Sequence, residues 1–250
     1  MKHEEYSRII PGASNAVLFI HGIVGTPHHF DDFLPLVPEN WSICNMLLEG
    51  HGGRVEDFGA TSMKRWKAQV EDKLQYLCDS HENVFIVGHS MGTLFALQGA
   101  VDHPQQVKGV FLLASPLRVW VQPLAVLSSL RVALNMGRKS NARLQAMYEA
   151  YSIQPDWRVW KYIPWIPRYI ELLAEIAATR KILRLVNASC WAFQSGKDEL
   201  VSKRACRELD RIPEIRIEIL QKSGHYYYEA QEKTHMLDVF GGCMCTTKEE

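Results

Sequence analysis

A serine stands between two glycines in the pentapeptide Gly-His-Ser-Met-Gly, which is centred on Ser90. A serine hydroxyl can attack a carbonyl carbon when a sharp turn between a strand and a helix exposes it. Here an apolar run, residues 83–89, comes before the serine, and a helix-like segment, residues 93–103, follows it. The serine of such a turn has a strained backbone, and side chains two residues away on either side would collide. Gly88 and Gly92 remove these collisions, so the pattern predicts that Ser90 is a nucleophile.

A serine nucleophile needs a base, and ten histidines compete for this role. In triads built on this type of turn the chain order is serine, acid and then histidine, so the base should follow the last strands. His225 lies in the turn Ser-Gly-His-Tyr-Tyr-Tyr directly after an apolar run, whereas His235 lies in a helical pattern. We therefore favour His225. His89 adjoins the nucleophile, and we expect its side chain to point away from the serine hydroxyl.

The carboxylate that orients this histidine should end a strand at the same edge of the sheet. The apolar run 189–195 is followed by Gly-Lys-Asp-Glu-Leu-Val, which offers Asp198 and Glu199. We favour Asp198 over Glu199 because it is the first carboxylate after the turn. In that position it would hold the imidazole of His225 in the required tautomer and stabilise the imidazolium that forms on proton transfer.

Two backbone N–H groups are expected to bind the oxyanion that forms during the attack. One belongs to Met91, the residue after the nucleophile. The second should come from the loop after an early strand, where the sequence Leu-Phe-Ile-His-Gly-Ile-Val-Gly-Thr offers the N–H of Ile23. We expect His21 to brace this loop as a structural residue.

Short apolar runs closed by turn-forming residues predict the strands that position these groups. They cover residues 16–22, 42–48, 83–89, 107–115, 189–195 and 215–221. Near-continuous apolar runs are typical of strands buried on both faces of a parallel sheet. Helix-like segments lie between them at 63–80, 93–103 and 202–212, the last with Ser202 as its N-cap. This alternation predicts an α/β fold with a mostly parallel central sheet flanked by helices.

The segment 117–187 interrupts this alternation, because it has no convincing strand and is rich in large aromatic residues. Helical patterns lie at 124–136, 141–152 and 168–186. We predict a helical cap over one edge of the sheet, inserted into a core formed by 1–116 and 188–250. The alternative is that these are ordinary outer-layer helices whose aromatic residues belong to the core.

An aromatic cap, with Phe30 and Phe33 near the oxyanion loop, suggests an apolar site for an acyl chain. The candidate substrate-binding residues are Phe30, Trp120, Trp157 and Trp160. Each of these side chains has a second interpretation, since aromatic residues also pack a cap onto a sheet.

Composition and charge exclude several other classes of protein. The chain has 28 basic and 28 acidic residues and no basic tract, so we expect no nucleic-acid partner. The first residues lack the apolar core of a signal peptide, and no apolar run approaches the roughly 18 residues of a membrane span. We therefore expect a cytoplasmic protein with reduced cysteines. Cys243 and Cys245 are expected to lie in a frayed terminus rather than in a zinc site.

Taken together, the motifs resemble the α/β-hydrolase superfamily and, within it, small bacterial carboxylesterases and monoacylglycerol lipases. The similar segments, which lie between residues 16 and about 240, are Gly-His-Ser-Met-Gly, His-Gly-Ile-Val-Gly-Thr, Leu-Glu-Gly-His-Gly-Gly, Ser-Gly-Lys-Asp-Glu-Leu-Val and Ser-Gly-His-Tyr-Tyr-Tyr-Glu-Ala-Gln-Glu. The resemblance is weakest over 117–187.

This resemblance implies the same nucleophile, acid and base, Ser90, Asp198 and His225, with the amides of Ile23 and Met91 as the oxyanion site. It also implies that Gly-His-Gly at 50–52 is a structural turn, so that His51 is not catalytic.

The expected activity is hydrolysis of carboxylic esters, either short-to-medium acyl esters or monoacylglycerols, through an acyl-enzyme and without a metal or organic cofactor. The partner would be a small ester or lipid-like substrate, and no oligomeric state is predicted. Thioesterases, carbon–carbon bond hydrolases, acyltransferases and some amidases use the same triad. A ligand-binding receptor or a scaffold on this fold is a further alternative from a different class.

Overall fold

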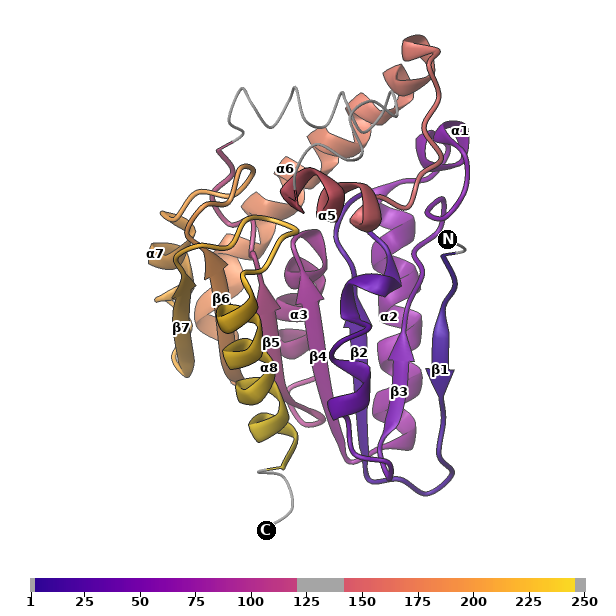
Figure 1. Ribbon diagram of the computed structural model, residues 1–250. Helices are drawn as coiled ribbons and strands as arrows, with labels where there is room; N and C mark the ends of the chain where they lie inside the picture. Colours follow the sequence, from indigo (N-terminus) through magenta and orange to yellow (C-terminus); the bar gives the residue numbers. More distant parts are fainter. Residues whose placement is uncertain (1–2, 121–141, 246–250) are drawn as a thin grey trace.

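A computed structural model describes residues 3–120 and 142–245 of the 250-residue chain. Its centre is one seven-stranded sheet with the strand order β1-β3-β2-β4-β5-β6-β7 (Figure 1). The strands are β1 (Tyr6–Arg8), β2 (Asn15–Ile20), β3 (Ser42–Asn45), β4 (Asn83–His89), β5 (Val107–Leu113), β6 (Ser189–Ser195) and β7 (Ile215–Leu220). All neighbouring strands are parallel except β1 and β3. The predicted mostly parallel sheet is therefore confirmed.

The six predicted apolar runs correspond to β2 through β7, and β1 is the strand that sequence reasoning missed. Its three residues are exposed or half-buried, so they carry no apolar run, and they pair antiparallel with β3 at the edge of the sheet. The central strands β2 and β4 are buried along almost their whole length. Their burial explains why their sequences are continuously apolar rather than alternating.

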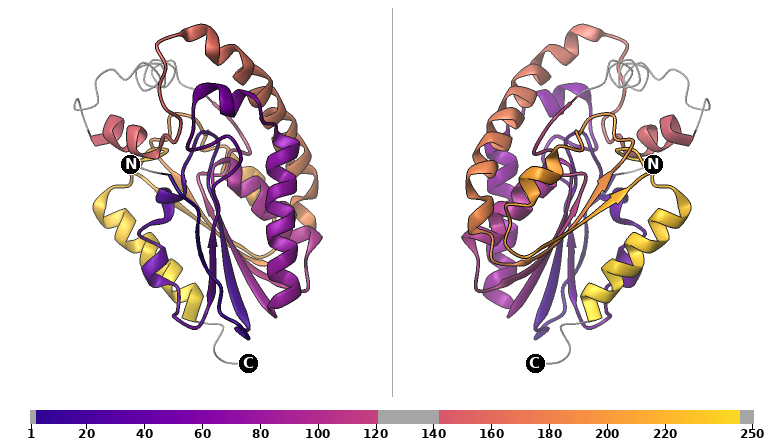
Figure 2. Two further views of the ribbon diagram at one scale, coloured as in Figure 1. Left: turned by 90° about the vertical axis from the view of Figure 1, so that its right-hand side faces the viewer. Right: turned by 90° about the vertical axis from the view of Figure 1, so that its left-hand side faces the viewer.

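Helices cover both faces of the sheet (Figure 2). The described helices are α1 (Val55–Gly59), α2 (Met63–Ser80), α3 (Met91–Asp102), α5 (Ala142–Ala150), α6 (Ile166–Ile182), α7 (Ala205–Leu209) and α8 (Ala230–Cys245). Four short 3-10 helices accompany them, η1 (Pro27–Phe30), η2 (Leu34–Leu36), η3 (Val159–Trp165) and η4 (Leu183–Leu185). The helices α2, α3 and α6 lie on one face, and α8 lies on the other with η1 and η2.

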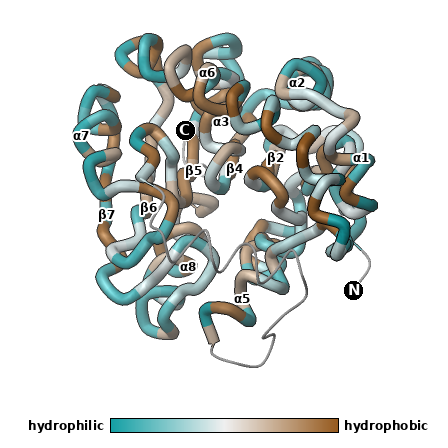
Figure 3. Tube along the Cα trace, turned by 90° about the horizontal axis from the view of Figure 1, so that it is seen from above, coloured by the Kyte–Doolittle hydropathy of each residue, from teal (hydrophilic) through white to brown (hydrophobic). Residues whose placement is uncertain are grey.

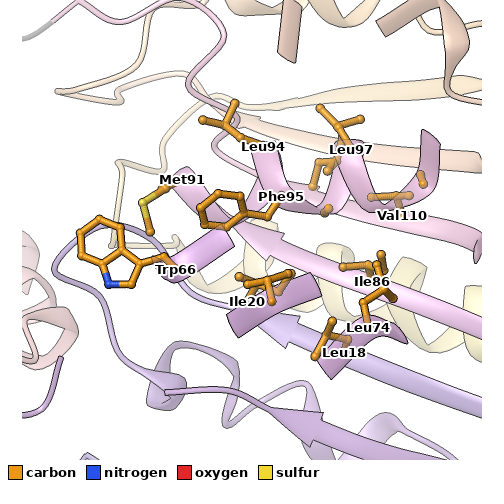
Figure 4. Close-up of a cluster of buried hydrophobic side chains, with 14 of the residues drawn as sticks. Leu18, Ile20, Trp66, Leu74, Ile86, Met91, Leu94, Phe95, Leu97 and Val110 are labelled. Atoms are coloured by element: carbon orange, nitrogen blue, oxygen red, sulfur yellow. The ribbon is translucent and has the colours of Figure 1, made fainter. Parts of the chain in front are cut away.

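The core has one layer of apolar side chains on each face of the sheet. On the face of α2 and α3, Trp66 and Phe95 pack against Ile20 and Ile86 from the central strands (Figure 4). The opposite face is aromatic, and its main members are Phe19, Phe30, Phe33, Phe111, Phe193 and Phe240. Because the apolar side chains of both layers are buried and in contact, the sheet is a firm support for the loops at its carboxyl edge.

The helix predicted over 63–80 is confirmed at both ends, because α2 has these bounds and Ser62 caps it by accepting a hydrogen bond from Arg65 N–H. The helix predicted over 202–212 is shorter, and α7 has Arg204 rather than Ser202 at its N-cap position. The physical reason is local. Ser202 accepts hydrogen bonds from the N–H groups of Arg204 and Ala205, which closes a separate turn before the helix begins.

The expectation of a frayed terminus at Cys243 and Cys245 is wrong, because α8 continues to Cys245. Met236 and Phe240 are four residues apart, Cys243 and Met244 follow three and four residues later, and all four are buried against the aromatic layer. Burial also raises the pKa of the Cys243 thiol to about 11. All six cysteines are free thiols.

Helices make up most of the described part of 117–187, although 117–120 and 151–158 are not helical. The pattern at 141–152 corresponds to α5, and the pattern at 168–186 corresponds to α6 and η4, whereas 124–136 lies outside the described residues. The helix α6 packs against α3 and α2 in the outer layer, where Glu175 accepts a hydrogen bond from Gln98. In contrast, α5 lies beyond the carboxyl ends of the strands (Figure 1). The boundaries of a cap therefore stay a prediction.

Candidate active site

Ser90 lies at the sharp turn between β4 and α3, at the carboxyl edge of the sheet. Figure 3 shows these two elements side by side, seen from above. Its backbone has φ 50° and ψ −119°, a strained conformation for a residue other than glycine. The turn is fixed by main-chain contacts. Ser90 N–H donates to Leu113 O over 2.8 Å, and Ser90 O accepts from Thr93 N–H over 3.0 Å. The side chain makes no capping hydrogen bond to α3, so the hydroxyl is not used to stabilise the helix.

The two glycines that flank this turn have the role predicted from the sequence. A Cβ atom on Gly88 would lie 2.7 Å from the carbonyl carbon of Gly92, and a Cβ atom on Gly92 would overlap Ile20 O. Both neighbours are backbone atoms that cannot move away. The turn therefore brings α3 so close to β2 that only glycine fits at these positions.

His225 and Asp198 meet at the same edge, although 27 residues separate them in the chain. His225 Nδ1–H donates to Asp198 Oδ2 over 2.9 Å, and the two side chains are only 1% and 2% exposed. The other carboxylate oxygen of Asp198 accepts hydrogen bonds from the N–H groups of Leu200 and Val201, over 2.8 and 2.7 Å. The remaining ring nitrogen of His225, Nε2, is buried and has no hydrogen-bond partner in the part of the chain that the structure describes. The imidazole is thus held at one nitrogen and free to accept a proton at the other.

The loop after β2 lies against the nucleophile turn. A Cβ atom on Gly22 would lie 2.9 Å from Ser90 Cβ, so the main chain of this loop passes directly beside the serine. Ile23 is the next residue of the loop. The prediction that His21 braces this loop is confirmed. Its Nδ1–H donates to Gly22 O, and its Nε2 accepts from Leu48 N–H, so one imidazole ties the loop to the segment after β3. The N–H groups of Ile23 and Met91 stay predictions as oxyanion donors.

Two of the histidines set aside in the sequence analysis, His89 and His51, have structural contacts. His89 Nε2–H donates to the main-chain oxygen of His225 over 3.1 Å, and its ring stacks on that of His29 with a centroid separation of 3.8 Å. His51 lies in a turn whose flanking residues, Gly50 and Gly52, both have positive φ. Its ring packs among aromatic side chains.

The four candidate substrate-binding residues do not share one location. Phe30 is fully buried in the aromatic layer, in contact with Phe19 and Phe33, because η1 turns its side chain toward the sheet. Trp120, Trp157 and Trp160 are exposed, at 69%, 75% and 56%. A cavity of about 300 Å³ between η1, α5 and the turn after β7 is lined by none of the four. The role of the three tryptophans in binding stays a prediction.

Sequence reasoning missed one residue that the structure brings to the site. His29 is half-buried and lines the cavity next to this site, where its ring stacks on His89 and its Nε2 lies 3.3 Å from the Tyr228 hydroxyl. Its place in the loop after β2 was the only signal, because a histidine two residues after a proline carries no motif of its own.

Four histidines have lowered pKa values in the folded protein, and we therefore expect the fold to lose stability in mild acid. Burial lowers the pKa of His21 to about 4 and that of His29 to about 3, and it lowers those of His51 and His89 well below their ordinary value. The unfolded chain takes up protons on these rings below pH 6.5, whereas the folded chain does not until about pH 4, so the free energy of unfolding falls as pH decreases through this window. Each ring contributes on the order of 1 kcal/mol per pH unit.

Urea unfolding at pH 7.5, 6.5 and 5.5 measures this effect, and the expected result is a falling midpoint at constant slope with denaturant. A His29→Asn variant should show a weaker pH dependence than the wild-type chain. A midpoint that stays constant or rises toward pH 5.5 would contradict the prediction.

Neither a metal cluster nor a membrane span is found among residues 3–120 and 142–245. No group of three or more His, Cys, Asp or Glu side chains in these ranges could hold a metal ion. None of the helices in these ranges is both long and apolar enough to cross a bilayer.

Comparison with known proteins gives consistent results for sequence and fold. The sequence model of the alpha/beta hydrolase family matches residues 17–235. A thermostable monoacylglycerol lipase of Bacillus sp. (strain H-257) is 34% identical over 89 residues, which is 35% of this chain and 36% of the lipase. A pimeloyl-[acyl-carrier protein] methyl ester esterase of Neisseria meningitidis (serogroup B, strain H44/76) is 31% identical over 121 residues, which is 48% of this chain and 43% of the esterase. The chain thus matches less than half the length of these curated relatives.

Solved structures extend the similarity of fold to nearly the whole chain. A structure from work on the metagenome-derived lipolytic enzymes LipS and LipT has a TM-score of 0.72 at 19% identity and covers 98% of both chains. The monoacylglycerol lipase of Paleococcus ferrophilus has a TM-score of 0.69 at 13% identity and covers 98% of this chain and 99% of its own. At these identities the likeness concerns the fold alone.

Proposed function

The chain belongs to the alpha/beta hydrolase family, and on that premise we propose that it hydrolyses carboxylic esters with Ser90 as nucleophile, His225 as general base and Asp198 as the orienting carboxylate. The observation that carries this proposal is the 2.9 Å hydrogen bond between His225 Nδ1 and Asp198 Oδ2. It joins a buried acid and a buried imidazole whose second nitrogen has no partner among the described residues. A strained serine whose hydroxyl makes no capping hydrogen bond to α3 lies at the same edge of the sheet.

The proposed reaction has two acyl-transfer steps. Ser90 Oγ attacks the ester carbonyl while His225 Nε2 takes the hydroxyl proton, and the N–H groups of Ile23 and Met91 bind the oxyanion. His225 then gives this proton to the leaving alcohol, which leaves an acyl-Ser90 ester. A water molecule, deprotonated by the same nitrogen, then attacks the acyl group. His225 gives that proton to Ser90 Oγ as the acyl–serine bond breaks and the acid is released. The start of α3 lies directly after Ser90, and the partial positive charge of this helix end favours the anionic intermediate.

The proposed substrates are short-to-medium acyl esters or monoacylglycerols, covered by a cap within 117–187. Two contacts of α5 and the residues after it support a cap over the site. Ser152 donates from its N–H to Val24 O, in the loop after β2, and Arg143 donates to Lys222 O, in the turn that carries the proposed base. The names of the Bacillus and Neisseria relatives, a monoacylglycerol lipase and an acyl methyl ester esterase, support an acyl ester as substrate.

The test is hydrolysis of p-nitrophenyl esters from acetate to palmitate by the purified protein, with monoacylglycerols and a matched acyl thioester in parallel. If the acyl site is an apolar pocket of limited length, kcat/KM should pass through a maximum at intermediate chain length, since each additional buried methylene contributes about 0.8 kcal/mol until the pocket is full.

A flat profile from acetate to palmitate would contradict a pocket of defined length. A thioester that reacts much faster than the matched oxygen ester would reassign the chain to thioester hydrolysis. No turnover of any ester by folded protein would contradict the proposed activity itself.

A further inference from the structure

The main chain of His225 is held at both of its polar groups by side chains. Its N–H donates to Glu199 Oε2 over 3.1 Å, and its carbonyl oxygen accepts a hydrogen bond from His89 Nε2–H over 3.1 Å. These two residues are chain neighbours of the other two members of the proposed triad, because His89 precedes Ser90 and Glu199 follows Asp198. The turn between β4 and α3 thus supplies the proposed nucleophile and, from the residue before it, a contact to the backbone of His225. The turn after β6 supplies the proposed acid and, from the residue after it, a second contact to that backbone.

These contacts are needed because His225 lies in an irregular turn between β7 and α8. The start of the turn, at Lys222 and Ser223, is fixed by other bonds. Lys197 N–H donates to Ser223 O, and Glu232 accepts from Lys222 N–H and from the Ser223 hydroxyl. None of these bonds involves His225 itself. A catalytic group displaced by about 1 Å can lower the rate by up to about 10²-fold, so a base on a turn needs its own restraint.

Glu199 is itself supported for this contact. Its second oxygen, Oε1, pairs with Arg143 of α5 over 3.5 Å, and its side chain is 24% exposed. Gly224 makes room for it, since a Cβ atom at that position would lie 3.0 Å from Glu199 Oε1. The carboxylate therefore lies between α5 and the turn, with one oxygen on the main chain of His225.

His89 is supported from the opposite side. Its ring stacks on that of His29, which in turn lies 3.3 Å from the Tyr228 hydroxyl. Burial lowers the pKa of His89 well below its ordinary value, so the ring is neutral and carries one proton. A carbonyl oxygen can only accept, and this proton must therefore be on Nε2.

We propose that Glu199 and His89 are positioning residues that hold the main chain of His225, so that its imidazole meets Asp198 and the serine at once. This inference rests on the proposed role of His225 as the base. Neither residue touches the substrate or exchanges a proton with it. Glu199, the alternative candidate for the triad acid, thereby has a separate role next to Asp198.

The experiment compares Glu199→Met, which keeps the side-chain volume and removes the acceptor, with Glu199→Gln, which keeps an acceptor and removes the charge. Glu199→Met should lower kcat by about 10- to 100-fold at nearly constant KM, because it loosens the base without altering the acyl site. Glu199→Gln should restore kcat to within about threefold of the wild-type value, because its amide oxygen can accept from His225 N–H.

The second readout needs no substrate. The proton shared by His225 Nδ1 and Asp198 should give a low-field NMR resonance that is sharp in the wild type and in Glu199→Gln, and broadened or lost in Glu199→Met.

His89→Gln and His89→Leu form the parallel pair, since the glutamine amide can still donate to the carbonyl oxygen. Glu82→Ala, which removes an exposed carboxylate just before β4, is the control.

Full kcat and an unchanged resonance in Glu199→Met would overturn the proposal. So would a loss in Glu199→Gln as large as in Glu199→Met, because the charge rather than the main-chain contact would then matter. Failure of the proposed function gives a different result, since in that case Ser90→Ala would keep activity while the resonance still reported the position of His225. Thermal unfolding of each variant separates these effects from loss of the fold.

Discussion

Replacing Ser90 with alanine should lower kcat for ester hydrolysis by about 10⁵- to 10⁶-fold, because no acyl-enzyme can form without the hydroxyl. The fold should remain intact. The Ser90 side chain makes no capping bond to α3, and the contacts that fix the turn come from the main chain of the same residue. Alanine tolerates the positive φ about as well as serine does, so the midpoint of thermal unfolding should change by no more than about 2 °C.

Three measurements check this result on the same preparation. They are kcat with p-nitrophenyl butyrate, the thermal midpoint, and mass spectrometry after exposure to a fluorophosphonate, which should add one adduct to the wild type and none to Ser90→Ala. Ser80→Ala serves as the matched control, because Ser80 ends α2 at the opposite edge of the sheet. Residual activity above about one per cent in a clean Ser90→Ala preparation would exclude Ser90 as the nucleophile.

Asp198→Asn should lower kcat by about 10⁴-fold, and the structure gives a specific reason. Oδ1 of Asp198 accepts hydrogen bonds from Leu200 N–H and Val201 N–H, and in asparagine only the carbonyl oxygen can take that place. The amide NH₂ group would then face His225 Nδ1. That nitrogen would have to accept, the ring proton would move to Nε2, and the imidazole could no longer take the proton of Ser90.

The pH–rate profile and the low-field proton resonance test this explanation. In Asp198→Asn the resonance of the Nδ1 proton should disappear, while the thermal midpoint should fall far less than kcat does. A decrease in kcat of less than about tenfold would contradict the role of Asp198. The neighbouring change Glu199→Gln, with its small expected effect, shows whether the two adjacent carboxylates differ as proposed.

The sequence predicted those parts of the fold that short-range physics determines. The β4–Ser90–α3 turn was predictable because Gly88 and Gly92 mark a backbone approach that no other residue permits. The helix α2 was predictable at both ends because Ser62 supplies a cap and the apolar residues that follow it are spaced for one face. The strand β1 was missed because three residues at a sheet edge, with exposed or half-buried side chains, leave no apolar pattern.

The remaining features depend on contacts between distant segments. Phe30 follows the loop of the proposed oxyanion site, and nothing in its neighbours reveals that η1 turns it toward Phe19 in the core. Asp198 and Glu199 are adjacent carboxylates that compete for one role in the sequence. In the structure both reach the same histidine, one at its ring and the other at its backbone. A pattern of residue types cannot separate two such roles, because they differ only in which atom of the partner is contacted.

The helix α8 completes the aromatic layer on one face of the sheet, where Phe240 packs against Phe19, Phe33 and Phe111. During translation these three rings therefore remain without their partner until residues 230–245 have left the ribosome. A nascent or prematurely terminated chain exposes them, and exposed aromatic surface is what chaperones and proteases bind. His225 is also made late, only 15 residues before Phe240. A chain that ends before His225 would therefore lack the proposed base and also expose these rings. Quality control would recognise it by its exposed aromatic surface.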